Sequence, residues 1–510
     1  MKNQYRKLVI NRIVITVLLI LVQVGWFIFA LEKLAGYSRW VGTAFTVLSV
    51  LIVLYIIGKD DNSAYKIGWI VLIMTLPLFG GLLYLFFGDK KPSRKLRRKL
   101  QKQHELYRGS LIREEGEQRE PEENSRAEGT LQYVEHMSDF PAYGDTHVTY
   151  YPSGEEMFED MLAGLKSARH FIFLEYFIVA EGRMWHTVLE ILKEKAAQGV
   201  DVRMIYDDMG CVALLPGGYD VQLEKYGIKC MAFNPVVPLL SLVMNNRDHR
   251  KILVIDGHTA FTGGINLADE YINEKVRFGY WKDTGVRLKG EGVWSFTEMF
   301  LEMWNAFRRE DEQIDRFRPH AHHPEPFAGK GLVQPYSDSP LDNEMVAENV
   351  YLEILHQAKK YVYIFTPYLI VDDVMRNALR LAAKRGVDVR IVTPGIPDKP
   401  MIFRLTRSNY PPLLKAGIRI YEYTPGFIHA KSYICDDEFG VVGSVNMDYR
   451  SLFLHFECAT LLYRTEGLEE LKQDCVKTME ESREITLADC KSGLIGGLFD
   501  SVLRVFAPLC

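Results

Sequence analysis

Two hydrophobic patterns alternate along the chain from about residue 131, and this alternation predicts an α/β fold. Apolar residues at helical spacing occur over 155–167 and 184–198, and short, strongly apolar runs follow them at 170–179 and 200–206. The same order returns later in the chain, with predicted helices at 344–359 and 373–384 and predicted strands at 361–367 and 387–393. Helices that alternate with strands in this way are typical of α/β sandwiches with mixed sheets.

Short repeated sequences indicate that the alternation is an internal duplication. The pentapeptide GVDVR occupies residues 199–203 and again 386–390, and a turn of the form x-Gly-Ile occurs at 226–228 and again at 416–418. Two copies of one unit predict two pseudo-repeated domains. The expected first domain, connector and second domain are 131–318, 319–332 and 333–489.

Three long apolar blocks precede the α/β region and predict a membrane anchor over residues 1–89. The first, 13–31, has no charged residue and would be about 28 Å long as a helix, enough to cross a bilayer core. The second covers 40–57, and the third, 67–87, is interrupted by Pro77. We expect two or three transmembrane helices. With two helices, the third block is re-entrant. With three, the stronger basic cluster that follows the third block determines which end of the anchor lies in the cytoplasm.

The basic cluster after the third block predicts the cytoplasmic face of the cell membrane for everything beyond Lys90. Residues 90–130 are expected to form a charged linker, whose basic first half is either a solvated helix or a helix on anionic headgroups. The C-terminal segment 490–510 carries apolar residues at helical spacing. It is expected to be an amphipathic helix that either packs on the protein or lies at the membrane interface.

Composition argues against several other classes of protein. A net charge of −5 over 510 residues provides no field to attract nucleic acid, so we expect no nucleic-acid partner. The seven cysteines lack the spacing of a zinc site or a disulfide framework. Asp207 and Asp208 are interpreted as a turn and helix cap rather than a metal site. We therefore expect no metal and no cofactor. The oligomeric state stays open.

One polar pattern, H-x-K-x4-D, occurs once in each half of the chain. Its residues are His249, Lys251 and Asp256 in the first half and His429, Lys431 and Asp436 in the second. Because alternate side chains of a strand share a face, each His should project beside its Lys, with the Asp in a supporting place on the other face. The repetition predicts one composite site where the two halves meet.

Small residues and an amide follow each copy of the pattern. They are Gly263, Gly264 and Asn266 in the first half and Gly443, Ser444 and Asn446 in the second. Bare backbone, a hydroxyl and amide groups are suited to approach an anion. Asn266, Ser444 and Asn446 are therefore expected to support phosphate binding.

The paired H-x-K-x4-D patterns, with their Gly-Gly or Gly-Ser and Asn, resemble those of the phospholipase D superfamily. Similarity to bacterial cardiolipin synthases extends further, to the apolar N-terminus, NNRDHRK at 245–251, FTPY at 365–368, DYRS at 448–451 and the Ala-Pro-Leu at 507–509. The resemblance implies two phospholipase D-type α/β sandwich domains after transmembrane helices. It also implies phosphatidylglycerol and anionic membrane lipid as partners.

The activity implied by the resemblance is transfer of a phosphatidyl group from one phosphatidylglycerol to another, which gives cardiolipin and glycerol through a phosphohistidine. By resemblance His249 is the nucleophile and His429 the general acid and base, although the residues themselves do not break that symmetry. The lysines would neutralise developing phosphoryl charge. With the same site, water as acceptor would make a membrane-anchored phospholipase D or nuclease. A third possibility is a scaffold without activity.

The resemblance also implies that Glu457 and Asp283 orient the two imidazole rings. The chain departs from the family pattern at Gly285, where relatives often carry His, and at His455, where Asn is common. We interpret His455 as a surface or linker residue. The apolar stretch 235–244, just ahead of the first motif, is expected to be either a loop that dips into the bilayer or a buried strand.

Overall fold

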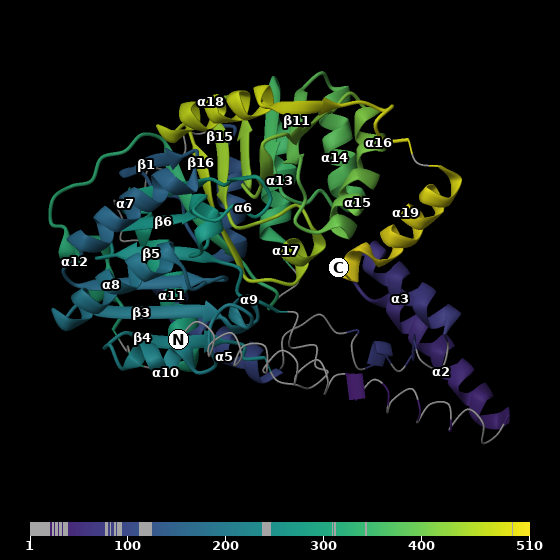
Figure 1. The fold of residues 1–510 in the computed structure, drawn as a ribbon, viewed down its shortest axis with the longest axis horizontal. Helices are drawn as coiled ribbons and strands as arrows, with labels where there is room; N and C mark the ends of the chain where they lie inside the picture. Colours follow the sequence, from purple (N-terminus) through teal and green to yellow (C-terminus); the bar gives the residue numbers. More distant parts are fainter. Residues whose placement is uncertain are drawn as a thin grey trace.

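The computed structural model describes residues 39–76, 94–111, 125–236, 246–308, 313–341, 344–491 and 493–509, together with residue 310 and isolated residues between 21 and 33 and between 80 and 88. Two α/β halves lie side by side, and three helices from the two ends of the chain pack together at one end of the molecule (Figure 1).

The first half is built on a mixed sheet of seven strands in the order β1-β8-β6-β5-β2-β3-β4. Strands β2, β3 and β4 run parallel to one another, and the others pair antiparallel. The strands are β1 (Thr146–Tyr151), β2 (Phe171–Tyr176), β3 (Asp201–Asp207), β4 (Lys229–Phe233), β5 (Lys251–Ile255), β6 (Thr259–Gly263) and β8 (Gly285–Gly290). Its helices and 3-10 turns are α7 (Gly154–Ser167), α8 (Arg183–Ala197), α9 (Asp208–Cys211), α10 (Tyr219–Glu224), η2 (Asp269–Ile272), α11 (Val293–Phe307), η3 (Asp315–Phe317) and α12 (Pro319–His322).

The second half repeats this sheet strand for strand, in the order β9-β16-β15-β14-β10-β11-β12, and adds β17 at the edge. Its strands are β9 (Leu332–Asp338), β10 (Tyr361–Phe365), β11 (Asp388–Pro394), β12 (Arg419–Tyr423), β14 (Ser432–Cys435), β15 (Phe439–Gly443), β16 (Glu457–Tyr463) and β17 (Ser482–Ile485). Its helices are α13 (Val346–Gln357), α14 (Asp373–Lys384), α15 (Pro400–Ser408), α16 (Tyr410–Leu414), α17 (Tyr449–Phe453) and α18 (Gly467–Glu480). The expected duplication of a mixed-sheet α/β unit is confirmed.

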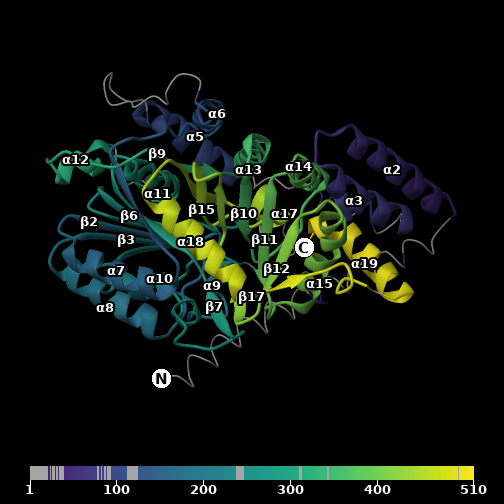
Figure 2. The same ribbon diagram turned by 90° about the horizontal axis from the view of Figure 1, so that it is seen from above.

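Contacts across the junction make the two halves one folded body. Helix α18 packs against β1 of the first sheet and several strands of the second, and Figure 2 shows it lying across the junction. Beneath it, the Lys282 ammonium lies 2.7 Å from the Asp474 carboxylate of α18, with both side chains buried. The Tyr150 hydroxyl donates to the same carboxylate at 2.6 Å. Apolar side chains of both sheets also belong to one continuous hydrophobic core.

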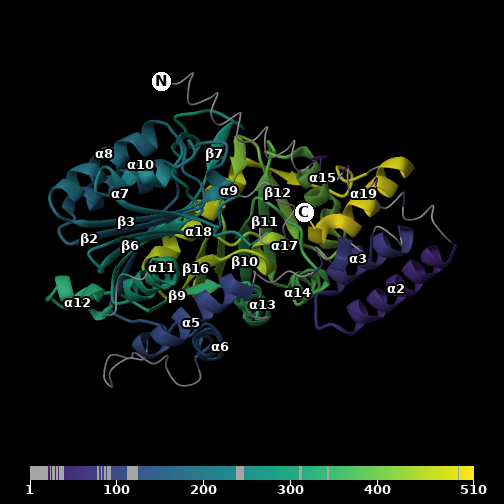
Figure 3. The same cartoon turned by 90° about the horizontal axis from the view of Figure 1, so that it is seen from below.

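The basic segment before the first domain forms a helix, α5 (Arg94–Leu111), that packs against α11. Leu96, Leu100 and Tyr107 are buried in the main core, so α5 is docked on the protein along one face. Helix α6 (Glu128–Ser138) follows and packs on β9, and Figure 3 shows α5 and α6 lying together over this region. The segment expected to be a linker thus contributes apolar side chains to the core.

Helices α2 (Arg39–Gly58), α3 (Ser63–Thr75) and α19 (Leu494–Phe506), the last followed by the turn η4 (Ala507–Leu509), form the end of the molecule. In the part of the chain that the structure describes, no helix combines the length and apolarity needed to cross a membrane. The predicted transmembrane helices are therefore not confirmed. Most of block 13–31 and of the loop 235–244 lies outside the described residues.

Candidate active site

Two backbone links between the halves build the site. Strand β7 (Tyr280–Lys282) pairs in parallel with β13 (Gly426–Ile428), and the His429 amide donates to the Lys282 carbonyl at 2.7 Å. The second link repeats the first with the halves exchanged, because the His249 amide donates to the Phe456 carbonyl at 2.9 Å. The residue that follows each bonded carbonyl is a carboxylate, Asp283 after Lys282 and Glu457 after Phe456. Each histidine is thereby held beside a carboxylate of the opposite half.

The carboxylates pair with the histidines across the junction. His249 Nδ1 lies 2.9 Å from Glu457 Oε1 and 3.0 Å from Oε2, and His429 Nδ1 lies 2.7 Å from Asp283 Oδ2. Both carboxylates are fully buried. A carboxylate beside Nδ1 favours the tautomer that carries its proton there, which leaves a lone pair on Nε2. Each motif histidine therefore takes its carboxylate from the opposite half.

The small residues after each motif make room for these carboxylates. A Cβ on Gly264 would lie 2.0 Å from Asp283 Oδ1, so only glycine allows this approach. At the equivalent place Ser444 donates its hydroxyl to the Glu457 carboxylate. In the structure these two positions receive the protein's own carboxylates, and their contact with a substrate anion stays a prediction.

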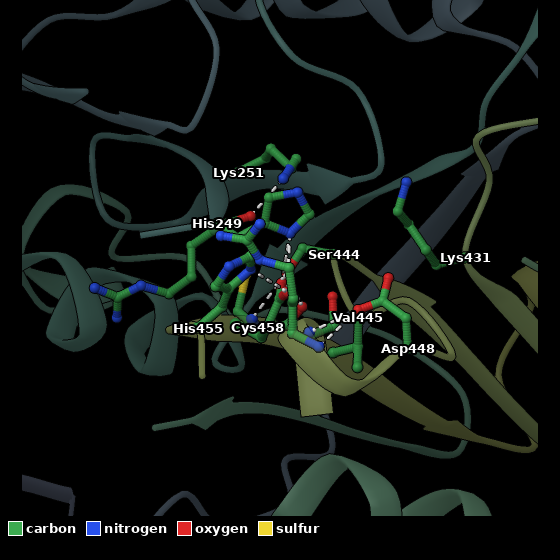
Figure 4. Close-up of polar contacts among 12 residues, drawn as sticks. His249, Lys251, Lys431, Ser444, Val445, Asp448, His455 and Cys458 are labelled. Atoms are coloured by element: carbon green, nitrogen blue, oxygen red, sulfur yellow. Dashed lines mark hydrogen bonds and ion pairs between the residues drawn. The ribbon is translucent and has the colours of Figure 1, made fainter. Parts of the chain in front are cut away.

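Lys251 and Lys431 are buried beside the histidines, each only 1% exposed. Both ammonium groups donate to the backbone carbonyl of the histidine two residues earlier, and Lys431 Nζ also lies 2.8 Å from His429 Nδ1. Figure 4 shows Lys251 next to the His249 ring and Lys431 farther to the right. Burial lowers the pKa of Lys251 to about 8. Burial and repulsion by the like charge of Lys251 lower the pKa of Lys431 to about 7.

Burial and the neighbouring lysines also keep the imidazole rings neutral. They lower the pKa of His429 to about 4, against the raising effect of Asp283, and lower the pKa of His249 well below its ordinary value. For Asp283 burial acts to raise the pKa, but the interaction with His429, which includes a hydrogen bond, and the Lys431 charge outweigh it and lower the pKa. The site therefore offers two neutral nitrogen bases beside two cations, an arrangement suited to phosphoryl transfer.

The two motif aspartates lie at the far end of their strands and serve the backbone. Asp256 accepts hydrogen bonds from the amides of residues 169, 170 and 171 at 2.8–2.9 Å. Asp436 accepts from the amides of residues 359, 360 and 361 in the same way and pairs with Arg126. Both adopt a left-handed conformation with φ near +50°. They fix the start of the neighbouring strand, and the structure does not bring them to the histidines.

The two asparagines differ in their surroundings. Asn266 donates its amide to the Tyr271 hydroxyl at 2.8 Å and accepts from the Ile178 amide, so its polar atoms are already used. Tyr271 in turn packs edge-on against the His429 ring at 5.5 Å. Asn446 is 6% exposed, and its Oδ1 has no hydrogen-bond partner among the described residues. The duplicated motif has thus diverged at this position.

His455 is not a surface or linker residue as expected, because it lies inside the site. Its ring is 5.5 Å from that of His249, and its Nδ1 is 3.8 Å from Glu457 Oε1. Its side chain is 10% exposed, and burial lowers its pKa to about 4. Its position two residues before Glu457 was the available signal, since residues i and i+2 of an extended segment share a face.

Comparison with known proteins places the chain in a family. The model of the family described as "Cardiolipin synthase, PLD-like domain" matches residues 161–280 and 351–479, and "Phospholipase_D-nuclease N-terminal" matches 47–88. The chain is 34% identical over 470 residues to Cardiolipin synthase 2 of Bacillus anthracis, covering 91% of this chain and 90% of the relative. The chain belongs to the cardiolipin synthase family.

Other relatives agree with this membership. Cardiolipin synthase of Staphylococcus aureus (strain Mu50) is 33% identical over 452 residues, which cover 87% of this chain and 90% of that one. An uncharacterized protein of Streptococcus mutans is 46% identical over 462 residues, 90% of this chain and 99% of the relative. Among solved structures, phosphatidylserine synthase of Haemophilus influenzae superposes with a TM-score of 0.55 at 13% identity, over 76% of this chain and 98% of that chain. This last likeness concerns the fold.

Proposed function

We propose that this protein is a cardiolipin synthase that transfers a phosphatidyl group between two phosphatidylglycerol molecules. The observation that carries the proposal is the pair of buried histidines, each oriented by a carboxylate from the opposite half and accompanied by a buried lysine. These groups supply a nucleophile, an acid for the leaving alkoxide and positive charge at the phosphorus without a metal ion.

In the first step, His249 Nε2 attacks the phosphorus of one phosphatidylglycerol while Glu457 holds the Nδ1 proton. The bond from phosphorus to the glycerol oxygen breaks, and His429 donates the proton that lets glycerol leave. In the second step, His429 removes the hydroxyl proton of the second phosphatidylglycerol. That oxygen attacks the phosphohistidine, which releases cardiolipin and restores His249. Bound phosphate raises the pKa of His429 from its low value and thereby allows it to carry a proton.

The role of each residue follows from its surroundings. Lys251 and Lys431 are the groups we assign to the phosphoryl charge, with Asn446 as an added polar contact. Asp283, Glu457 and Ser444 position the rings. Asp256, Asp436 and Asn266 are assigned to support, since hydrogen bonds to backbone or tyrosine already occupy them.

We further propose that the helices at the end of the molecule hold it on the membrane, with the catalytic halves at the cytoplasmic face. Apolar side chains are exposed along all three of these helices. They include Leu51, Leu54 and Ile57 of α2, Ile67 and Met74 of α3, and Leu494, Ile495 and Leu498 of α19. An apolar surface of this extent on a phospholipid enzyme is suited to contact with lipid.

Analysis of products from phosphatidylglycerol vesicles tests the proposal. Purified full-length protein should form cardiolipin and glycerol in equal amounts without added cofactor. Phosphatidic acid in place of cardiolipin would show that water is the acceptor and that the protein is a phospholipase D. No lipid turnover at all would contradict both assignments.

A further inference from the structure

We propose that His249, His455 and Glu457 form a binding site for a divalent transition-metal ion, and that the bound ion inhibits the enzyme. This inference rests on the proposed function only in the use of His249 as the nucleophile. The sequence does not suggest the site, because Glu457 and His455 lie about 200 residues beyond His249 and no metal-ligand spacing links them.

The three side chains present their ligand atoms to one point. One nitrogen or oxygen from each lies within 4.8 Å of the others, and all three residues are enclosed by protein. His249 Nδ1 and His455 Nδ1 lie 2.9 Å and 3.8 Å from Glu457 Oε1. Two imidazoles and a carboxylate are donors suited to Zn²⁺, Co²⁺ and related ions, and they leave further positions for water.

The hydrogen bonding of the His455 ring is the second observation in favour of the site. Both of its ring nitrogens are buried, and neither has a hydrogen-bond partner in the described part of the chain. Its distance of 3.8 Å from Glu457 Oε1 exceeds that of a hydrogen bond. A buried polar group without a partner costs free energy, so its unused lone pair is available to a ligand. A metal ion satisfies that lone pair.

An acidic cavity leads to His455. It has a volume of about 600 Å³ and lies between the α2–α3 turn and the second half. Carboxylates line it, among them Asp60, Asp61, Asp338, Glu348, Asp372 and Asp373. Such a lining attracts cations and repels the phosphate of a lipid, so the cavity is suited to supply metal ions to the buried site.

Coordination and catalysis compete for the same imidazole. Attack on phosphorus requires the Nε2 lone pair of His249, with its proton on Nδ1 beside Glu457. A metal bound at Nδ1 displaces that proton, so that a neutral ring then carries it on Nε2 and cannot attack; a metal bound at Nε2 takes the lone pair itself. The ion also engages the Glu457 carboxylate. Occupation of the site should therefore stop the first step.

The test compares the full-length, untagged wild type with His455→Asn, and uses His147→Asn as the matched control on an exposed position of β1. Each protein is stripped with a chelator, and its binding of Co²⁺ is followed by visible absorption in the absence of lipid. Turnover in phosphatidylglycerol vesicles is then measured against added Zn²⁺ and expressed relative to the metal-free rate of the same variant, which cancels differences in basal rate.

The wild type and His147→Asn should bind one Co²⁺ per chain and be inhibited by Zn²⁺. His455→Asn should need at least about tenfold more of either ion, the scale of losing a metal-site group. Glu457→Gln should weaken Co²⁺ binding as well. The inference is overturned if the wild type binds no Co²⁺, or if His455→Asn matches the wild type in binding. Co²⁺ binding is measured without lipid turnover. It therefore still tests the metal site if the cardiolipin synthase proposal fails.

Discussion

His249 of the first half meets Glu457 of the second through contacts of 2.9 Å and 3.0 Å from one imidazole nitrogen to both carboxylate oxygens. The reciprocal pair, His429 with Asp283, closes at 2.7 Å. The site therefore exists only when both halves are folded and docked. A carboxylate that acts through an imidazole is a positioning group, and its removal should affect turnover more than substrate binding.

Glu457→Gln should lower kcat by roughly 10² to 10⁴-fold, because the neutral amide no longer stabilises the charge that develops on the His249 ring. KM should change little. Cardiolipin formation in phosphatidylglycerol vesicles gives both constants, and the thermal unfolding midpoint shows whether the fold is kept. Glu469→Gln, at an exposed position of α18, is the matched control and should leave both constants unchanged. A wild-type kcat in Glu457→Gln would exclude the positioning role.

Lys431→Met should slow turnover by about 100-fold or more, since it removes a buried charge from the phosphoryl group while keeping side-chain length. Lys251→Met should behave alike. The same substitution at exposed Lys384 of α14 controls for loss of a lysine as such. Rates are measured at saturating lipid, so that weaker binding does not enter. Activity within a few fold of wild type would remove the lysines from the chemistry.

The pH profile of kcat/KM should fall on the alkaline side as Lys431, with a pKa of about 7 in the free enzyme, loses its charge. Burial lowers this pKa most, the like charge of Lys251 adds to it, and the carboxylates of Asp283, Glu457 and Asp448 oppose it. Bound phosphate stabilises the ammonium, so the alkaline limb of kcat should lie at higher pH than that of kcat/KM. An alkaline limb of kcat/KM near pH 10, the range of an ordinary lysine, would contradict this assignment.

On the acid side, kcat/KM should persist below the pKa of an ordinary histidine, because burial and the two lysines hold the pKa of the nucleophile His249 well below that value. Stability should show the low pKa of the other ring, which is about 4 for His429 in the folded protein. Between about pH 6.5 and 4 the unfolded chain binds a proton at this position and the folded chain does not, so the free energy of unfolding falls as the pH falls. Urea denaturation at pH 7 and pH 5 measures the change. His429→Asn should reduce it, and an unchanged difference between the two pH values would contradict the buried neutral ring.

Asp474→Ala should destabilise the fold by roughly 3 to 5 kcal/mol, because it leaves the Lys282 ammonium and the Tyr150 hydroxyl buried without their partner. The double variant Lys282→Met with Asp474→Leu should recover much of this loss. Urea denaturation of the three proteins provides the comparison. Equal stabilities would mean that this ion pair does not hold α18 over the junction.

Substitution of Leu494, Ile495 and Leu498 by Ser should weaken sedimentation with anionic vesicles while leaving the unfolding midpoint unchanged. These side chains are 95%, 85% and 69% exposed, so they contribute little to the core, and each buried leucine-sized side chain is worth about 1.5 to 3 kcal/mol of transfer. Val221→Ser, at an exposed position of α10 in the first half, is the control. Unchanged sedimentation would remove α19 from the lipid contact.

The amino-acid sequence was sufficient for the elements and their duplication, because these depend on local patterns. The periodicities predicted α7, α8, α13 and α14 to within two residues, and the repeated GVDVR marked β3 and β11 as equivalent strands. The double H-x-K pattern identified His249, Lys251, His429 and Lys431 as one composite cluster. The position of Asp207 as a helix cap was also predicted correctly, since its carboxylate accepts from the amides of Met209 and Gly210.

Only the tertiary structure decided how these parts combine. The exchange of carboxylates, Glu457 to His249 and Asp283 to His429, depends on two backbone links between strands far apart in the chain, which no local pattern records. The same links bring His455 to the site. The use of Gly264 to admit a carboxylate, and of Asp256 to bind a neighbouring strand, likewise follows from contacts over long sequence separations. Sequence patterns specify which side chains share a face, whereas docking of the two halves determines which faces meet.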